Sequence, residues 1–421
     1  MRVRQGLPCL AAAFLACFST WCAEAQVVRV DPAGPVRSIR AALATARPRT
    51  TIIVGAGIYR EGRLRIDKSV TLAGEPGAIL DGEGQHTVLE IGGDSITVRG
   101  LVVRNTGMSQ TEDRAGILAS GARWCRIEQI RSERNLFGIY LANSADCVID
   151  GNTVIGSGTS QTLQGNGIQV WQSERITVSS NVVTGHRDGI YFEFVTNATV
   201  AANESRGNER YGMHFMFSND CRYERNVFRA NGSGVAVMYS HRVAMIANTF
   251  ERNWGSAAYG LLLKDISDSE IRDNRFLSNS TGLYLEDSNR NQVTGNEFTG
   301  NGWALKLLAS AQDNRMAHNA FAGNTFDVST NSRHSFSTFE NNYWDRYRGY
   351  DLDRNGTGDV PFAPVRLFAL IVEQSPASLM MLRSPLVDAL DLVERVLPVL
   401  TPAEMVDRSP LMRPPVGGAS R

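Results

Sequence analysis

The sequence predicts an all-β protein, a parallel β-helix with coils of about 22 residues. A glycine followed by an apolar residue recurs at spacings of 22, 29, 22, 23, 22, 26 and 22. These glycines are Gly116, Gly138, Gly167, Gly189, Gly212, Gly234, Gly260 and Gly282. An asparagine ahead of a short strand keeps step with them at Asn152, Asn181, Asn203, Asn226, Asn248, Asn274, Asn296, Asn319 and Asn341. Both markers place their extra residues in the same two turns, near 152–166 and 249–259, so they describe a single repeat.

The residues between the markers have the pattern of short strands joined by tight turns. Each repeat contains two or three alternating segments, such as 282–286, separated by Asn, Gly, Asp or Ser, and this alternation is typical of strands. Such a unit cannot bury its apolar face alone, so the units must stack at about 4.8 Å per coil. We expect the marker asparagines to form a ladder between coils. The right-handed sense of this pectate-lyase-like solenoid follows from resemblance to other solenoids of this coil length.

Composition excludes several classes of protein. The chain has 421 residues with 43 basic and 43 acidic side chains, hence a formal net charge of zero. This balance argues against broad phosphate neutralisation on nucleic acid and against a polybasic membrane-surface protein. A charged content of 20% beside 43% hydrophobic residues is typical of a folded chain rather than a disordered one.

Residues 1–25 predict an export signal peptide. Two early arginines precede an apolar run over 7–18, and Ala23-Glu24-Ala25 offers a small-x-small cleavage site. The run is too short for a transmembrane helix, which needs about 20 apolar residues. A lipoprotein signal ending at Cys17 is a poorer alternative. We therefore expect a periplasmic mature chain that starts near Gln26.

The mature chain divides into a solenoid and a tail. Residues 26–363 are expected to form the β-helix domain, with an N-terminal cap made by helical residues 38–46 and a following strand over 51–54. The coil pattern stops at 341–344, and the composition shifts to Pro, Met and Leu from Pro364.

Residues 364–421 are expected to form a helical C-terminal tail. Ser384-Pro385 is a typical helix start, and apolar residues then recur at helical spacing until Pro398. Such a tail either folds onto the solenoid or docks on a partner, and we assign it to partner docking.

Three cysteines lie beyond the signal: Cys125, Cys147 and Cys221. Cys147 and Cys221 precede a marker asparagine by five residues, a phase held elsewhere by Ile176, Ala198 and Val243, so they are expected to point inward. We interpret them as inert buried thiols, because buried cysteine behaves as a small hydrophobe. A bond between Cys125 and Cys147, one coil apart, is the alternative.

A candidate copper site lies on the outer face of one strand column. Residues four places after each glycine read Trp171, Glu193, Met216, Met238, Lys264 and Glu286, and those two places after read Gln169, Tyr191, His214, Ala236, Leu262 and Tyr284. His214 and Met216 therefore share a face, with Met238 and Glu193 on the adjacent coils. An imidazole and two thioethers are soft ligands suited to Cu(I), bound transiently. Glu193 could neutralise the ion or accept a hydrogen bond from a ligand.

Two other interpretations of this face stay open. A loop or the tail could cover it, with the methionines packed beneath or contacting a partner. The same columns could instead line a sugar-binding groove. The other histidines have no soft neighbours in register and are expected in turns or on the surface: His86, His186, His241, His318 and His334.

Residues 351–359 resemble the first part of a calcium-binding loop. Asp351, Asp353, Asn355 and Asp359 occupy positions 1, 3, 5 and 9 of the loop, with Gly356 at position 6. Position 12 is a phenylalanine instead of the usual glutamate. A structural calcium ion is one interpretation, and an Asx- and Gly-rich turn that closes the solenoid is the other.

Together these features resemble the NosD family of periplasmic β-helical maturation factors for nitrous oxide reductase. The resemblance is carried by the export signal, the coil repeat, the closing segment from Asn341-Asn342-Tyr343-Trp344-Asp345 to Pro361, the His214/Met216 pair and the Met-bearing tail. It covers nearly the whole mature chain.

The resemblance implies an accessory protein of denitrification that works with an ABC-type complex of the ATPase NosF and the permease NosY. Such a protein receives copper from the chaperone NosL and passes it to apo nitrous oxide reductase. The resemblance implies no enzymatic activity, and the sequence shows no coherent pair of carboxylates. The alternatives are a uronate lyase, epimerase or hydrolase, and a non-catalytic adhesin. A lyase or hydrolase needs clustered acids, whereas Glu193 and Glu286 are expected four coils apart, roughly 19 Å.

Overall fold

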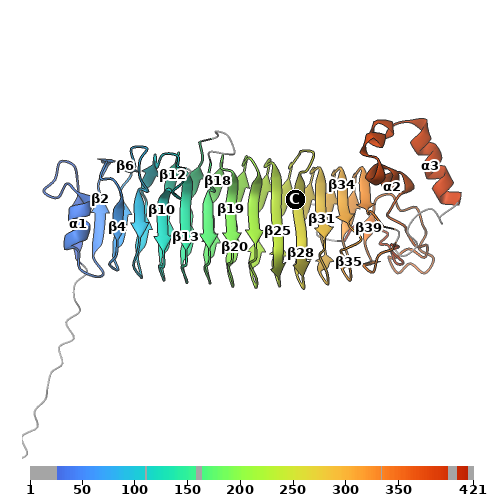
Figure 1. Cartoon of the computed structure of the whole chain (residues 1–421). Helices are drawn as coiled ribbons and strands as arrows, with labels where there is room; N and C mark the ends of the chain where they lie inside the picture. Colours follow the sequence, from blue (N-terminus) through green and yellow to red (C-terminus); the bar gives the residue numbers. More distant parts are fainter. Residues whose placement is uncertain (1–25, 110, 158–163, 333, 397–404, 416–421) are drawn as a thin grey trace, which may run out of the picture.

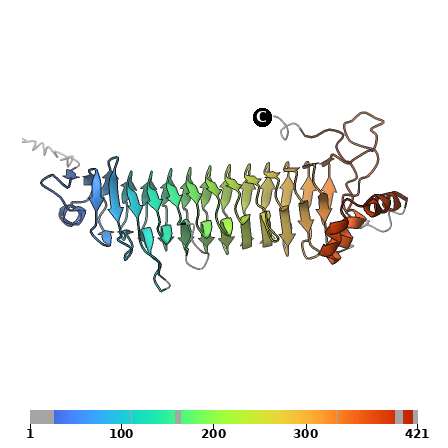
Figure 2. The ribbon, with the colours of Figure 1, turned by 90° about the horizontal axis from the view of Figure 1, so that it is seen from above.

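The chain forms a right-handed parallel β-helix, as predicted (Figure 1). The computed structural model describes residues 26–109, 111–157, 164–332, 334–396 and 405–415. The predicted signal peptide lies outside these residues. Each complete coil contributes one strand to each of three sheets, all paired in parallel, and the solenoid is elongated along the stacking direction (Figures 1 and 2).

Sheet A contains fourteen strands in stacking order. They are β1 (Val27–Val30), β2 (Thr51–Val54), β5 (Thr71–Gly74), β8 (Thr97–Arg99), β11 (Arg126–Glu128), β14 (Val148–Asp150), β17 (Thr177–Ser179), β20 (Thr199–Ala201), β23 (Arg222–Glu224), β26 (Ala244–Ile246), β29 (Glu270–Arg272), β32 (Gln292–Thr294), β35 (Arg315–Ala317) and β38 (Thr338–Glu340).

Sheet B contains thirteen strands. They are β3 (Gly57–Tyr59), β6 (Ala78–Asp81), β9 (Val102–Arg104), β12 (Arg131–Glu133), β15 (Thr153–Ile155), β18 (Val182–Thr184), β21 (Glu204–Arg206), β24 (Val227–Arg229), β27 (Thr249–Glu251), β30 (Arg275–Leu277), β33 (Glu297–Thr299), β36 (Ala320–Ala322) and β39 (Tyr343–Trp344).

Sheet C contains twelve strands and carries the candidate site. They are β4 (Leu64–Ile66), β7 (Leu89–Ile91), β10 (Ala115–Ser120), β13 (Phe137–Ala142), β16 (Ile168–Trp171), β19 (Asp188–Glu193), β22 (Tyr211–Met216), β25 (Ser233–His241), β28 (Tyr259–Ser267), β31 (Thr281–Glu286), β34 (Trp303–Leu307) and β37 (Phe326–Ser329).

The predicted asparagine ladder runs through the turn between sheets A and B. At each step the Oδ1 atom accepts the backbone N–H and the Nδ2 group of the preceding ladder residue, as Asn226 does for Asn203 at 2.9 and 3.0 Å. The last predicted member was wrong: Asn342, not Asn341, accepts from Asn319. Asn341 lies one residue earlier, in a left-handed turn conformation with φ 54°.

A second asparagine ladder, which the sequence markers missed, fills the turn between sheets B and C. Its members are Asn208, Asn231, Asn253, Asn279, Asn301 and Asn324. His186 continues this turn one coil earlier and donates its backbone N–H to Asn208. His186 therefore lies in a turn, as predicted, but its side chain is buried, at 1% exposed. Burial lowers its pKa to about 4, so the ring is neutral.

A short helix lies at the N-terminal end of the solenoid. Helix α1 (Ile39–Thr45) begins after Ser38, whose hydroxyl accepts the N–H of Ala41, and it buries Ile39 and Ala42 in the main core. Its apolar face thus covers the end of the first coils.

The C-terminal segment packs on the last coils, which is the first of the two alternatives left open for it. Helix α2 (Leu367–Gln374) places Phe368 against Phe326 of β37, and the 3₁₀ helix η2 (Pro376–Met381) and helix α3 (Pro385–Val396) follow (Figure 1). Residues 405–415 then return to the solenoid end. There Asp407 ends the asparagine ladder, accepting bonds from the Asn342 N–H and Nδ2 and from the Trp344 indole at 2.9–3.1 Å.

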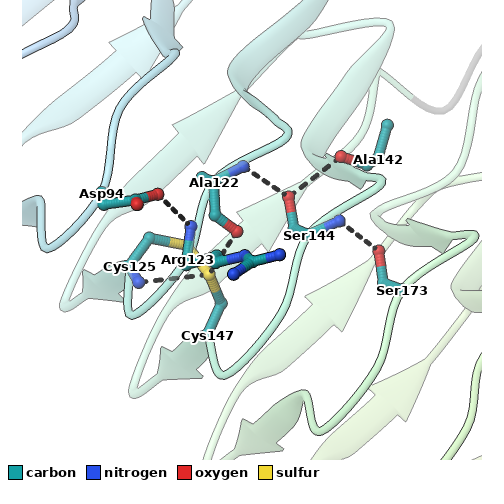
Figure 3. The surroundings of a disulfide bond; sticks show 8 residues. All are labelled: Asp94, Ala122, Arg123, Cys125, Ala142, Ser144, Cys147 and Ser173. Carbon is teal, nitrogen blue, oxygen red and sulfur yellow. Dashed lines mark hydrogen bonds between the residues drawn. A yellow bond between two sulfur atoms is a disulfide. The ribbon is translucent and has the colours of Figure 1, made fainter.

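Cys125 and Cys147 form a disulfide between adjacent coils (Figure 3). The interpretation as two free thiols was wrong for this pair, because parallel stacking brings their Cα atoms to 4.6 Å, within bonding range. Both are fully buried, as the register predicted, and Cys221 is the buried free cysteine among the described residues. Beside the disulfide, the Ser144 hydroxyl accepts the Ala122 N–H and donates to the Ala142 carbonyl (Figure 3).

Candidate metal site on sheet C

The predicted register of the outer columns is confirmed strand by strand. Glu193 pairs with Met216, Met216 with Met238, Met238 with Lys264, and Lys264 with Glu286. The intervening residues Met213 and Phe215 are fully buried in the core. His214 and Met216 therefore point to the opposite, outer face, since successive side chains of a strand alternate.

The four predicted ligands differ in exposure. Met216, Met238 and Glu193 are partly exposed, but His214 is only 6% exposed. Its ring lies against Tyr191, with centroids 5.1 Å apart, and against Tyr211 at 4.9 Å. His214 is thus on the outer face but covered by aromatic neighbours, rather than open to solvent as the sequence suggested.

A buried ion pair between Asp188 and Arg210 lies beside the Nδ1 atom of the His214 ring. Asp188, which is fully buried at the start of β19, accepts a 2.8 Å bond from Arg210 Nε and a second bond from its Nη2. The Nδ1 atom of His214 lies 3.4 Å from Asp188 and 3.1 Å from Arg210. Burial acts to raise the pKa of Asp188, but the hydrogen bonds from Arg210 and His214 outweigh it and hold this pKa below its usual value.

The second ring nitrogen of His214, Nε2, is the atom of this cluster that could bind a metal ion. Nε2 is buried and has no hydrogen-bond partner among the described residues. Metal binding at Nε2 requires the tautomer in which Nδ1–H donates to Asp188, and in that tautomer Nδ1 does not accept from Arg210, which can only donate. Asp188 would then fix the tautomer that ligates.

Tyr191 connects the carboxylate and thioether members of the site. Its hydroxyl donates to Glu193 Oε2 at 3.2 Å and lies 4.0 Å from the sulfur of Met216. Burial, assisted by the Glu193 charge, raises the pKa of Tyr191 to about 12. The phenol is therefore a neutral hydrogen-bond donor that holds Glu193 and Met216 close together.

The donor set that results is soft and mixed. Within the described residues no group of three or more His, Cys, Asp or Glu side chains could hold a metal ion, so any site here depends on the methionine sulfurs. Thioether and imidazole donors favour Cu(I) over calcium, magnesium or manganese.

Toward the C-terminal coils, the same two columns no longer contain soft donors. Lys264 forms a 3.0 Å ion pair with Glu286, and Leu262 and Ala236 replace the polar residues of the other column. Glu193 and Glu286 are four strands apart in the register, as predicted.

The calcium-like loop folds as a network of Asx turns. Asp351 accepts the N–H groups of Asn355 and Gly356 at 3.1 and 3.0 Å, and Asp359 accepts that of Leu352 at 2.7 Å. Asp353 also accepts the Asn355 N–H, at 3.2 Å. Both interpretations of this loop remain predictions.

Sequence reasoning missed Asp188, Arg210 and Tyr211. The signal was available for one of them: in the position before each repeat glycine, Asp188 is the one carboxylate in a column of apolar, hydroxyl and amide residues. Arg210 lies in a turn, where the repeat fixes no side-chain direction.

The fold and this cluster define a β-helical protein with imidazole and thioether side chains gathered on one sheet face. Residues 157–349 match the family model described as "Periplasmic copper-binding protein (NosD)". The chain is 31% identical over 411 residues to a protein of Pseudomonas aeruginosa named "Probable ABC transporter binding protein NosD", covering 86% of this chain and 88% of that one. A protein of the same name from Stutzerimonas stutzeri is 28% identical over 381 residues, covering 86% of each. The chain belongs to the NosD family.

Solved structures extend the likeness in fold alone. The surface adhesin PfbA of Streptococcus pneumoniae superimposes with a TM-score of 0.55 at 13% identity, over 70% of this chain and 88% of that one. Among the described residues, no helix has the length and apolarity needed to cross a bilayer.

Proposed function

We propose that this protein is a non-catalytic periplasmic copper carrier that binds Cu(I) transiently through His214, Met216 and Met238, with Glu193 beside them. The observation that carries the proposal is the register: one imidazole with a free nitrogen and two thioethers occupy adjacent positions on the outer face of sheet C. The description of the family as copper-binding supports it.

A site with a small number of protein ligands suits a carrier, which must release its ion. A closed four-ligand site would retain copper, whereas two or three soft ligands on a face release it to a partner. Because Tyr191 and Tyr211 cover His214, we infer that loading requires one of these rings to move aside.

The partners of this carrier belong to the same proposal. We infer that it receives copper from the chaperone NosL, works with the permease NosY and the ATPase NosF, and supplies apo nitrous oxide reductase for assembly of its copper centre. The names of the relatives, which describe ABC transporter binding proteins, support the transporter association. The predicted signal peptide is consistent with export of the chain.

The C-terminal helices offer an exposed apolar surface for the permease. On α3, Leu386 is 50% exposed, Leu392 64% and Val393 40%, and clusters of exposed apolar residues mark interaction sites. We place the partner-docking role of the tail on this face.

Titration with Cu(I) in the presence of a competing chromophoric chelator tests the metal site. We expect His214→Ala and the double variant Met216→Ala/Met238→Ala each to weaken binding at least about tenfold, since each removes a ligand of a low-coordinate ion. His86→Ala and Met380→Ala are matched controls, because both side chains are exposed far from the cluster. Equal affinity in the wild type and all variants would reject these ligands.

Co-purification with the permease and ATPase tests the docking face. We expect the triple variant Leu386→Ser/Leu392→Ser/Val393→Ser to lose association, while Val27→Ser, an exposed change at the opposite end, keeps it. Substitution is preferable to truncation, because the returning segment buries Met405 and Asp407 in the solenoid end. Full retention by the triple variant would exclude docking through α3.

The carbohydrate-active alternative has weaker support. Retaining and inverting glycosidases place two carboxyls within about 5–10 Å of each other, whereas Glu193 and Glu286 are four coils apart and Glu286 is paired with Lys264. Asp188, on the same strand as Glu193, is buried in its ion pair with Arg210.

A further inference from the structure

A cavity of about 430 Å³ lies between the outer face of sheet C and the C-terminal helices. One wall comes from strands β28, β31 and β34, and the other from Val372, Glu373 and Leu379 of α2 and η2, the helices drawn at the C-terminal end in Figure 1. Its volume is within the range of small-molecule sites, about 300–1,000 Å³. The cavity lies on later coils than the His214 cluster and shares no residue with it.

Aromatic rings make up much of the lining. Tyr259 and Tyr284, on neighbouring coils, have ring centroids 4.9 Å apart and planes tilted by 52°. Trp303 lies one coil further, and Trp254, which is 58% exposed, stands at the rim. A set of differently tilted rings around one space presents several apolar faces to a flat ligand.

The charged groups of the cavity neutralise each other. Lys306 Nζ is 3.0 Å from Glu373 Oε2 and 4.7 Å from the centre of the Trp303 ring. Glu373 also accepts a 3.2 Å bond from the Ser329 hydroxyl. Because the two charges are paired with each other and Lys306 already occupies the Trp303 face, the lining has no unpaired charge to attract a cation or an anion. The lining therefore favours a neutral ligand.

The neutral polar groups of the cavity are available for hydrogen bonds. The phenol oxygens of Tyr259 and Tyr284 have no partner within the described part of the chain. Ser256, Ser280 and Thr281 also belong to the lining, and the Ser280 hydroxyl oxygen already accepts the Gly255 N–H at 3.0 Å. Burial raises the pKa of Tyr284 to about 12, so this phenol keeps its proton. A purely apolar ligand would leave these groups unpaired, at a cost in binding free energy.

We propose that this cavity binds a neutral pyranoside, with a sugar face stacked on the exposed Trp254 ring and the tyrosine rings and its hydroxyls bonded to the two phenols. A sugar ring combines an apolar face with an equatorial belt of hydroxyls, which matches this lining. The proposal is independent of copper binding, since the two sites share no side chain.

Isothermal titration calorimetry of the full chain tests the proposal with defined probes. The neutral probes are cellobiose, maltose and N,N′-diacetylchitobiose, and the charged ones are choline and glucuronate. We expect saturable binding of at least one neutral disaccharide and weaker or no binding of both charged probes. Absence of saturable binding for all three disaccharides would overturn the proposal, and tighter binding of choline would reassign the cavity to a cation.

Variants locate the binding. Trp254→Ala and Tyr284→Phe are expected to weaken disaccharide binding about tenfold, and Tyr284→Phe removes one hydroxyl without changing the ring. Trp124→Ala, another exposed tryptophan on a distant coil, and His214→Ala are expected to bind as the wild type does. Unchanged affinity in both cavity variants rejects this site, whether or not copper binding holds.

Discussion

The turn between sheets A and B and the outer face of sheet C follow opposite rules. In the turn, the same residue type recurs coil after coil, from Asn152 to Asn342, and each amide is fully bonded to its neighbours. On the outer face the residue type varies along the column, from Glu193 through Met216 and Met238 to Lys264. Repetition maintains the stack, and the proposed metal site lies where repetition breaks on the outer face.

The largest expected effect comes from breaking the repeating turn. Asn226 accepts two bonds from Asn203 and donates to the Val200 carbonyl and to Asn248, all within 2.9–3.0 Å. We expect Asn226→Ala to lower the free energy of unfolding by about 3–5 kcal/mol, because several buried polar groups lose their partners. Urea denaturation followed by circular dichroism measures it.

The control is an exposed side-chain amide on a strand of sheet A. Gln292 is exposed on β32, and Gln292→Ala is expected to change stability by no more than about 0.5 kcal/mol. Equal losses in the two variants would show that the ladder contributes no more than an ordinary surface amide.

This contrast also explains what the sequence could predict. The repeat is forced by close packing: a Cβ on Gly189 would lie 2.6 Å from the Gly212 carbonyl oxygen of the next coil. A constraint of this kind recurs at fixed spacing, so the coil length, the register and the columns of the candidate site were all readable from the sequence.

The features that the sequence did not predict depend on individual side chains that do not recur from coil to coil. His186 replaces an asparagine in the second ladder, and Asp407 reaches the ladder's end from 65 residues away. The covering of His214 by Asp188, Arg210 and Tyr211 depends on side chains that reach across columns. Spacing predicts which residues share a face, but not which rotamers bring them into contact.

At the end of the second ladder, a carboxyl group takes part in the turn and should make stability depend on pH. Asp327 is 3% exposed and lies 3.4 Å from the Asn324 amide. Burial raises its pKa to about 6, with a smaller opposing effect of Arg346. Because the folded-state pKa is above the unfolded value, its contribution is complete below about pH 4 and is lost as pH rises through about 6.

The size of this change in the free energy of unfolding follows from the pKa shift of Asp327. From 3.8 to about 6, it corresponds to about 3 kcal/mol at 1.36 kcal/mol per pKa unit. We expect Asp327→Asn to remove this part of the slope in urea midpoints measured from pH 4 to 7, while Asp313→Asn, an exposed change, leaves it. An unaltered slope in Asp327→Asn would assign the pH dependence to other groups.

On the outer face, the expected effect of a neighbouring side chain is smaller. We expect Asp188→Asn to weaken Cu(I) binding about tenfold, equivalent to about 1.4 kcal/mol, because the amide no longer favours the Nδ1–H tautomer of His214. Nitrogen-15 chemical shifts of the His214 ring report this tautomer directly. Weaker copper binding with unchanged ring shifts would mean that Asp188 acts through the fold and not through the imidazole.

The smallest expected effect lies two coils away on the same outer column. Lys264 and Glu286 are both about one-third exposed and form a 3.0 Å pair, and exposed pairs contribute about 0–1 kcal/mol. A double-mutant cycle with Lys264→Ala and Glu286→Gln should give a coupling energy below about 1 kcal/mol, with copper affinity unchanged in both single variants. If Lys264→Ala instead altered copper affinity as much as Asp188→Asn, the site would extend along the whole column. The proposed metal site would then not be confined to the coils of His214, Met216 and Met238.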